Sequence, residues 1–125
     1  MKYRTAFAGL ALALASCLAQ AQDFPSKSMQ IVLPVPPGGQ MDWLARTVGA
    51  ELEKRWKHAV VVENKPGAGG LLASSTVARS QPDGHTLLLI NSAVSVYPVL
   101  TKTDFDAEKD LVAIASAMES PYGHL

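Results

Sequence analysis

Short apolar runs alternate with amphipathic stretches between residues 30 and 90. Residues 30–35, QIVLPV, form an apolar and partly β-branched run, which predicts a buried strand that ends near Pro34. In residues 42–56 apolar side chains recur at every fourth position, which predicts an amphipathic helix with a stripe formed by Leu44, Val48, Leu52 and Trp56. Asp42 begins this stretch and suits an N-cap or a first-turn acid.

The same order of strand, glycine-rich loop and helix then repeats. Residues 59–63, AVVVE, predict a second strand, and residues 71–79, LLASSTVAR, predict a helix that a Pro-Asp-Gly turn ends. Residues 86–90, TLLLI, predict a third strand, and residues 111–117 a fourth, after a short helical piece interrupted by Pro98. Strands that alternate with helices pair in parallel through right-handed crossovers, so the predicted fold class is α/β.

The N-terminal segment is set apart from the fold. Residues 1–21 combine a basic start, an apolar run too short to span a membrane, and a small-residue cleavage site that ends at Ala21. This pattern predicts a signal peptide, which leaves residues 22–125 exported to the periplasm. Cys17, the only cysteine, also lies in a box that resembles the one before lipidated cysteines, but we favour cleavage at Ala21.

The charge balance limits the kind of partner. The chain holds 11 basic and 11 acidic residues, and loss of Lys2 and Arg4 with the signal peptide makes the remainder slightly acidic. A nucleic-acid surface needs a basic patch that displaces counterions, and the sequence has none. We therefore expect a small-molecule partner and no nucleic acid.

Three loops follow the first three predicted strands: PPGGQM, NKPGAGG and NSAVS. Loops that leave the carboxyl ends of parallel strands lie together at one edge of the sheet, where ligands bind. A helix that starts there presents unpaired backbone N–H groups, and glycine lets a ligand approach them closely. These features favour a small anion, either carboxylate or phosphate, although glycine and proline are also ordinary turn residues.

Nucleotide binding and catalysis find little support. The second loop has Leu72 where G-x-G-x-x-G needs its third glycine, and Asn91 stands where the ribose-binding acid belongs. No P-loop and no G-x-S-x-G are present. The three histidines lack partners at metal or base spacing, and we interpret His58 and His85 as surface residues. Trp43 and Trp56 are interpreted as core residues of the first helix.

Three segments together resemble a known family. PVPPGGQMDWLAR, VVVENKPGAGG and QPDGHTLLL, in this order and spacing, resemble the Bug family, the extracytoplasmic solute receptors of tripartite tricarboxylate transporters. The similarity covers about residues 24–112. It implies a monomeric receptor with a periplasmic-binding-protein-like (Venus flytrap) fold, without catalysis or cofactor, that captures small carboxylates and passes them to the membrane subunits of the transporter.

The resemblance also implies which residues hold the ligand, largely through main-chain groups and waters. The matching positions are Pro37, Gly38, Gly39, Asp42, Gly67, Ala68, Gly69, Gly70, Asn91 and Ser92. For Asp42 the alternative is a purely capping role, since its carboxylate would repel an anionic ligand. The third loop is poorer in glycine than the family's usual one.

Family members are more than twice as long as this chain, which stops at Leu125. The resemblance therefore implies that residues 22–125 form an incomplete N-terminal α/β domain, without the second domain and with weak or undetectable ligand binding. Two alternatives remain open at the level of sequence. One is an exported α/β enzyme that uses the glycine loops as an oxyanion site, and the other is a short protein that binds a partner on its own.

Overall fold

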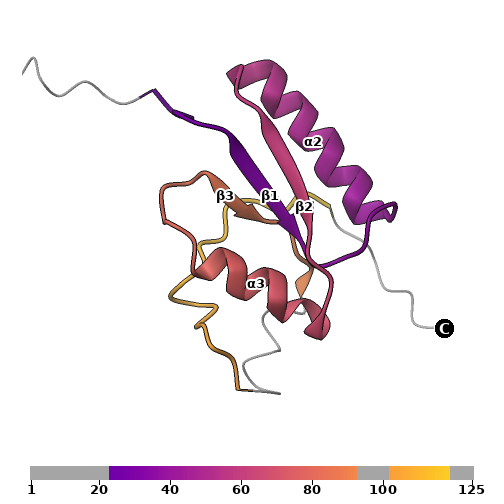
Figure 1. Cartoon of the computed structure of the whole chain (residues 1–125), viewed down its shortest axis with the longest axis vertical. Helices are drawn as coiled ribbons and strands as arrows, with labels where there is room; N and C mark the ends of the chain where they lie inside the picture. The colour runs from indigo at the N-terminus through magenta and orange to yellow at the C-terminus, as the bar shows by residue number, and fades with distance from the viewer. Residues whose placement is uncertain (1–22, 93–101, 119–125) are drawn as a thin grey trace, which may run out of the picture.

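A computed structural model describes residues 23–92 and 102–118, in which strands and helices alternate (Figure 1). The elements are β1 (Met29–Leu33), α2 (Gln40–Trp56), β2 (Val60–Asn64), the short 3₁₀ helix η1 (Ala68–Gly70), α3 (Leu71–Ala78) and β3 (Thr86–Leu88). The predicted signal peptide with Cys17, and the helical piece around Pro98, lie outside the described residues.

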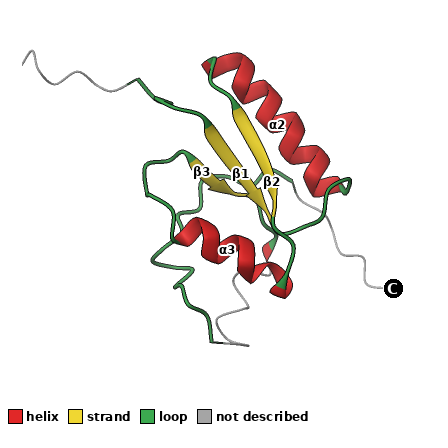
Figure 2. Ribbon diagram, in the orientation of Figure 1, coloured by secondary structure: helices red, strands yellow, loops and turns green. Residues whose placement is uncertain are grey.

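The three strands form one parallel sheet in the order β2-β1-β3 (Figure 2). The chain therefore moves from β1 to one side through α2, and then crosses back over β1 through α3 to reach β3. The prediction of an α/β fold with parallel strands is confirmed. The register places Leu33 opposite Asn64 and Val32 opposite Leu88, so that all three strands end at the same edge.

Alternate residues of β1 supply the cores on the two faces of the sheet. Ile31 and Leu33 pack with Ala45 of α2 on one face, while Val32 packs with Ala73 and Val77 of α3 on the other. Val32 and Leu33 are fully buried. Removal of each such side chain from water stabilises the fold by about 1.5–3 kcal/mol, so β1 is the central element that both helices cover.

Helix α2 faces the sheet with a different side from the one that its apolar stripe predicts, and its backbone lies close to the strands. Its buried residues are Asp42, Ala45 and Gly49, and a Cβ on Gly49 would lie 3.3 Å from Val60 Cγ1. Val48 of the predicted stripe is exposed, and Trp43, expected in the core, is 67% exposed. Small residues let the helix backbone approach the strands, so these face the sheet and the larger apolar side chains lie beside it.

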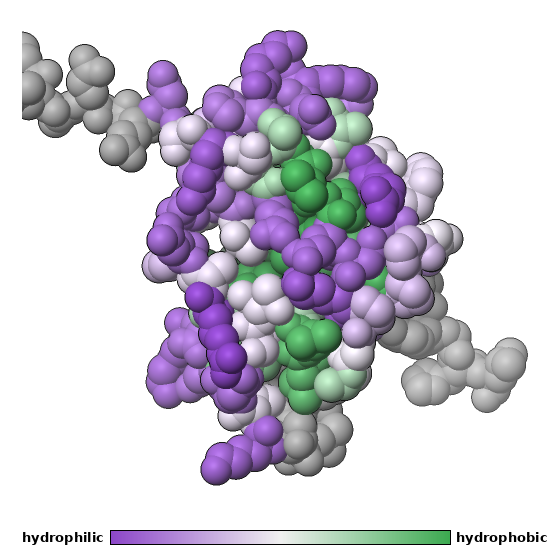
Figure 3. Space-filling view, viewed as in Figure 1, coloured by the Kyte–Doolittle hydropathy of each residue, from purple (hydrophilic) through white to green (hydrophobic). Residues whose placement is uncertain are grey.

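Two further expectations are corrected. Residues 111–117 form no strand: Val112 and Ile114 are 85% and 78% exposed, and only Leu111 packs against the α3 side of the sheet. An apolar run becomes a strand only where its backbone pairs with a neighbour, and this segment pairs with none of the described strands. The third strand is also shorter than residues 86–90. Apolar patches lie among polar residues on the face of the described chain that Figure 3 shows.

His85 is buried rather than a surface residue. It is 7% exposed and lies against Phe24, with ring centroids 5.0 Å apart. Its Nε2 accepts a hydrogen bond of 3.2 Å from the Ser26 amide, and its Nδ1 lies 3.1 Å from the Asp83 carbonyl oxygen. The histidine thus ties the segment before β1 to the turn before β3, at the edge opposite the glycine loops.

Candidate functional site: three loops at the carboxyl edge of the sheet

Three loops leave the carboxyl ends of the strands: loop 1 (residues 34–39), loop 2 (residues 65–70, which include η1) and loop 3 (residues 89–92). Loops 1 and 2 are joined at their roots, because the Lys65 amide donates a 2.7 Å hydrogen bond to the Leu33 carbonyl. The Leu89 amide donates to the Val32 carbonyl at 3.0 Å, which joins the start of loop 3 to the same strand. The predicted gathering at one edge is confirmed for the described parts of these loops, and residues 93–95 of NSAVS lie outside the described residues.

Gly70 shows how closely the loops approach one another. A Cβ at this position would lie 3.3 Å from Pro34 Cβ of loop 1 and 3.6 Å from Ile90 Cδ1 of loop 3. Gly70 is buried and has φ of +102°, a conformation that glycine adopts without strain. The absence of a side chain at this point therefore allows all three loops to meet.

Two helices begin at this edge without a side chain at their N-caps. The N-cap of α2 is Gly39 and that of α3 is Gly70, and neither helix start receives a side-chain hydrogen bond from its cap. The first N–H groups of a helix have no partner within it and carry the positive end of the helix dipole. The start of α2 is thus suited to a small anion. At the start of α3 the Gly70 and Leu71 amides already donate to the Gly67 and Ala68 carbonyls.

Loop 2 adds an unusual backbone conformation. Gly67, Ala68, Gly69 and Gly70 all have positive φ, and Ala68 is the non-glycine residue among them, with φ of +47°. A left-handed conformation costs a residue with a Cβ about 1–2 kcal/mol. Backbone strain of this kind is concentrated at functional sites, which makes loop 2 part of the candidate site.

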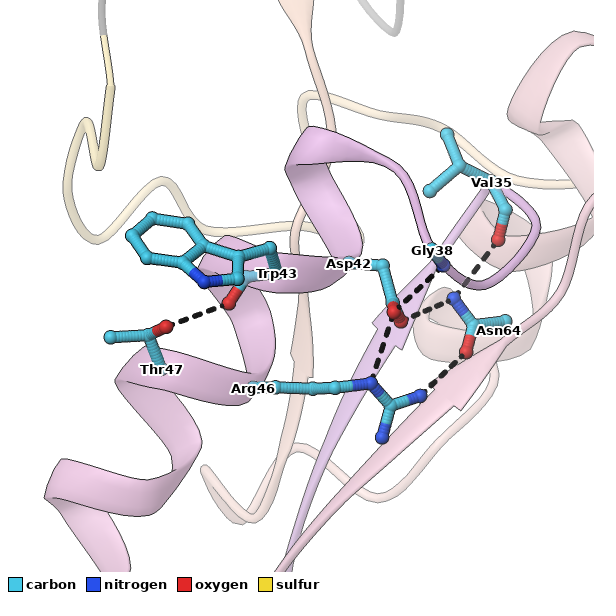
Figure 4. Close-up of polar contacts among 7 residues, drawn as sticks. All are labelled: Val35, Gly38, Asp42, Trp43, Arg46, Thr47 and Asn64. Carbon is cyan, nitrogen blue, oxygen red and sulfur yellow. Dashed lines mark hydrogen bonds and ion pairs between the residues drawn. The ribbon is translucent and has the colours of Figure 1, made fainter.

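A hydrogen-bond network joins loop 1 to the root of loop 2 (Figure 4). Asp42 Oδ2 accepts from the Gly38 amide and from Arg46 Nε, both at 3.0 Å, and Asp42 Oδ1 accepts from Asn64 Nδ2 at 2.9 Å. Asn64 Nδ2 also donates to the Val35 carbonyl at 3.1 Å, and Arg46 donates from an Nη to Asn64 Oδ1 at 3.3 Å. Asp42, Arg46 and Asn64 are called the Asp42 network below.

The charge of Asp42 is stabilised by this network. The hydrogen bond from Arg46, followed by those from the Gly38 amide and Asn64, lowers the pKa of Asp42 from 3.8 to about 2. The same pairing raises the pKa of Arg46. Asp42 is therefore ionised at any physiological pH, and Arg46 compensates its charge next to loop 1.

The ten residues predicted to bind the ligand fall into two groups. Eight are exposed on the three loops: Pro37, Gly38, Gly39, Gly67, Ala68, Gly69, Asn91 and Ser92. Asp42 and Gly70 are buried. The amides of Gly38 and Gly70 are already hydrogen-bonded, to Asp42 Oδ2 and to the Gly67 carbonyl. The main-chain donors of the edge are therefore those at the start of α2 and around Ala68, and Asp42 is held inside the network.

Arg46 and Asn64 were missed by the sequence interpretation. Arg46 stands four residues after Asp42, a spacing at which opposite charges meet on a helix, so this signal was present. Asn64 carried no comparable signal, because its contacts depend on how β2 pairs with β1. A shallow pocket of about 560 Å³ lies beside the network, and Gly38, Trp43, Arg46 and Thr47 contribute to its lining.

Within residues 23–92 and 102–118, no group of three or more histidine, cysteine or acidic side chains is placed to hold a metal ion. None of the helices in this described part is long and apolar enough to cross a membrane.

Comparisons with known proteins point to one family. The family model described as "Tripartite tricarboxylate transporter family receptor" matches residues 44–125. A UPF0065 protein of Bordetella bronchiseptica is 43% identical over 112 residues, which is 88% of this chain and 33% of that protein. Protein BugT of Bordetella pertussis is 32% identical over 104 residues, 81% of this chain and 32% of BugT. The chain thus spans about a third of the length of these curated relatives.

Solved structures agree with the sequence relatives. MatC from Rhodopseudomonas palustris, determined with bound malate, has 36% identity and a TM-score of 0.59, over 70% of this chain and 30% of MatC. A second R. palustris protein, determined with adipate, has 32% identity and a TM-score of 0.56, over 58% of this chain and 24% of that one. The described lobe has the fold of these binding proteins. The chain belongs to the Bug family of tripartite tricarboxylate transporter receptors.

Proposed function

We propose that the three-loop edge binds the carboxylate group of a small organic acid, and that the chain acts as part of a periplasmic receptor for a tripartite tricarboxylate transporter. One observation carries this proposal: the start of α2, which has no side-chain cap, and the positive-φ turn of loop 2, which leads into α3, meet at one edge. The malate and adipate bound by two structural neighbours support a carboxylate as the anion.

The proposed contacts come from main-chain groups. The start of α2 after Gly39 and the turn around Ala68 would each donate N–H groups to carboxylate oxygens, while Ser92 contributes a hydroxyl from loop 3. Asp42 and Gly70 would support the site from below, because both are buried. Main-chain recognition suits a receptor, because it holds a carboxylate without providing a nucleophile or a base. We therefore propose no enzymatic activity.

We expect this chain to bind its ligand weakly. The eight loop residues named above are exposed, so each hydrogen bond to a ligand competes with water. Tight sites bury most of the ligand surface. The proposal therefore places residues 22–125 in an incomplete N-terminal domain, monomeric, exported by its signal peptide, that requires a second domain to enclose the ligand and to present it to the membrane subunits.

The test uses a variant that separates folding from binding. Gly39 has φ of −85° with no atom within 4 Å of an added Cβ, so any residue fits there. Gly39→Asp supplies a favoured N-cap and should stabilise α2, but it places a negative charge where the ligand carboxylate would bind. Gly39→Asn is the matched control, since it caps the helix without a charge.

Isothermal titration with malate, adipate and citrate would measure binding by the chain without its signal peptide, with inorganic phosphate and ATP as comparison ligands. Trp43, exposed beside Gly38, provides an independent fluorescence signal that a Trp43→Phe variant controls. We expect weak carboxylate binding that Gly39→Asp abolishes and Gly39→Asn only reduces. Binding of ATP but of no carboxylate, or unchanged carboxylate binding by Gly39→Asp, would refute the proposal.

A further inference from the structure

The Asp42 network reaches across the two loops that contribute most to the proposed site. Val35 and Gly38 belong to loop 1, Asp42 and Arg46 to the first turns of α2, and Asn64 is the last residue of β2, directly before loop 2. Apart from the strand pairing itself, these side chains make the hydrogen bonds that connect the body of loop 1 to the root of loop 2.

Three hydrogen bonds engage both the amide nitrogen and the amide oxygen of Asn64. Both hydrogens of its Nδ2 are donated, one to the Val35 carbonyl and one to Asp42 Oδ1, while its Oδ1 accepts from Arg46. An amide group is the side chain that supplies two donors and an acceptor in one plane. Aspartate has the same shape but would place a second carboxylate against Asp42.

We propose that Asn64 and Asp42 are positioning residues, which fix the distance and orientation of loop 1 relative to loop 2 so that both reach the same ligand. The inference rests on the proposed function, since it assigns these residues to the same site. Asp42 orients loop 1 through the Gly38 amide, and Asn64 transmits that position to loop 2. Arg46 compensates the buried negative charge, so the network does not repel an anionic ligand.

The first arm of the test needs no ligand. NMR spectra of the ¹⁵N-labelled protein report the amide resonances of the loop glycines. For Asn64→Ala the resonances of Gly38 and Gly39 in loop 1 are followed. For Asp42→Ala those of Gly67 and Gly69 in loop 2 are followed, so each substitution is observed in the other loop. We expect shifted amide resonances at these glycines and faster hydrogen exchange at Gly38. Ser80→Ala is the matched control, because its hydroxyl donates to the Val77 carbonyl at the end of α3 that lies away from the loops.

The second arm measures carboxylate affinity by titration. Loss of one hydrogen bond to a charged group corresponds to about a tenfold change, so we expect Asn64→Ala to weaken binding by about tenfold or more and Asn64→Asp to weaken it further. Ser80→Ala should bind as the unaltered chain does. Ala73→Gly, which loosens the opposite face of the sheet, controls for a general loss of stability.

The two arms separate the two proposals. If the unaltered chain binds no carboxylate, the proposed function fails, while the glycine resonances still report whether the loops are coupled. If Asn64→Ala leaves the Gly38 and Gly39 amides unchanged and Asp42→Ala leaves Gly67 and Gly69 unchanged, the positioning role is refuted. It is equally refuted if Ala73→Gly weakens binding as much as Asn64→Ala. Should Asn64→Asp not fold, Asn64→Ala carries the same comparison.

Discussion

The packing of the three loops around Gly70 can be measured with a series of glycine-to-alanine substitutions. Gly70 and Gly38 have similar positive φ, +102° and +93°, but only Gly70 has atoms near an added Cβ, with Pro34 Cβ at 3.3 Å. Gly39 has neither feature. The three positions therefore separate backbone strain from contact between loops.

The magnitudes follow from these two terms. Alanine at a positive φ costs about 1–2 kcal/mol, and we expect this destabilisation for Gly38→Ala. Gly70→Ala adds an overpacked contact with Pro34, which costs at least about 1 kcal/mol. The expected total loss in the free energy of unfolding for Gly70→Ala is therefore about 2–3 kcal/mol. Gly39→Ala should change stability by less than about 0.5 kcal/mol.

Urea unfolding followed by tryptophan fluorescence measures these differences. With an m-value of about 1 kcal/mol/M for a small domain, the midpoint of Gly70→Ala should lie about 1 M below that of Gly38→Ala. Carboxylate affinity should fall in the same order, since Pro34 moves away from loop 2. Equal midpoints for Gly38→Ala and Gly70→Ala would show that loops 1 and 2 do not touch at this point in solution, and would refute the reasoning.

Three further predictions concern the sheet and the Asp42 network. Leu33→Ala should destabilise the fold by about 2–5 kcal/mol and Val61→Ala, at an exposed position, by less than about 0.5 kcal/mol, as measured by urea unfolding. Gly49→Val should cost about 1–3 kcal/mol, because its Cβ would crowd the β2 side chains and displace α2. The lowered pKa of Asp42 makes its stabilising effect complete above about pH 4 and lost as the pH falls towards 2, so Asp42→Asn should flatten the dependence of the urea midpoint on pH in that interval.

Each of these predictions has an outcome that contradicts it. Similar losses for Leu33→Ala and Val61→Ala would mean that β1 is not the central strand. A neutral Gly49→Val would place α2 further from the sheet than described. If Asp42→Asn leaves the dependence of the urea midpoint on pH unchanged below about pH 4, another group causes the acid sensitivity. Asp83 is then the first group to examine, since its pKa is also lowered to about 2, mainly by Lys27.

The alternation of elements was determined by the sequence itself. Apolar runs of five or six residues, separated by glycine loops and an amphipathic stretch, require a parallel sheet covered by helices, and the observed strands agree with the prediction to within two residues at each end. The same reasoning placed the glycine loops at one edge, because parallel strands all end there. These properties depend on neighbours in the chain, which a sequence displays directly.

The interior of the candidate site was decided by the tertiary structure alone. Asn64 bonds to Asp42 and to Val35, which are 22 and 29 residues away in sequence, so its role exists only after β2 has paired with β1. Residues 111–117 show the converse: their composition suits a strand, but within residues 23–92 and 102–118 they pair with no strand. The side of α2 that faces the sheet was also settled by close approach at Gly49 rather than by its largest apolar residues. Local patterns specify which elements form, whereas contacts between distant segments specify which side chains support the candidate site.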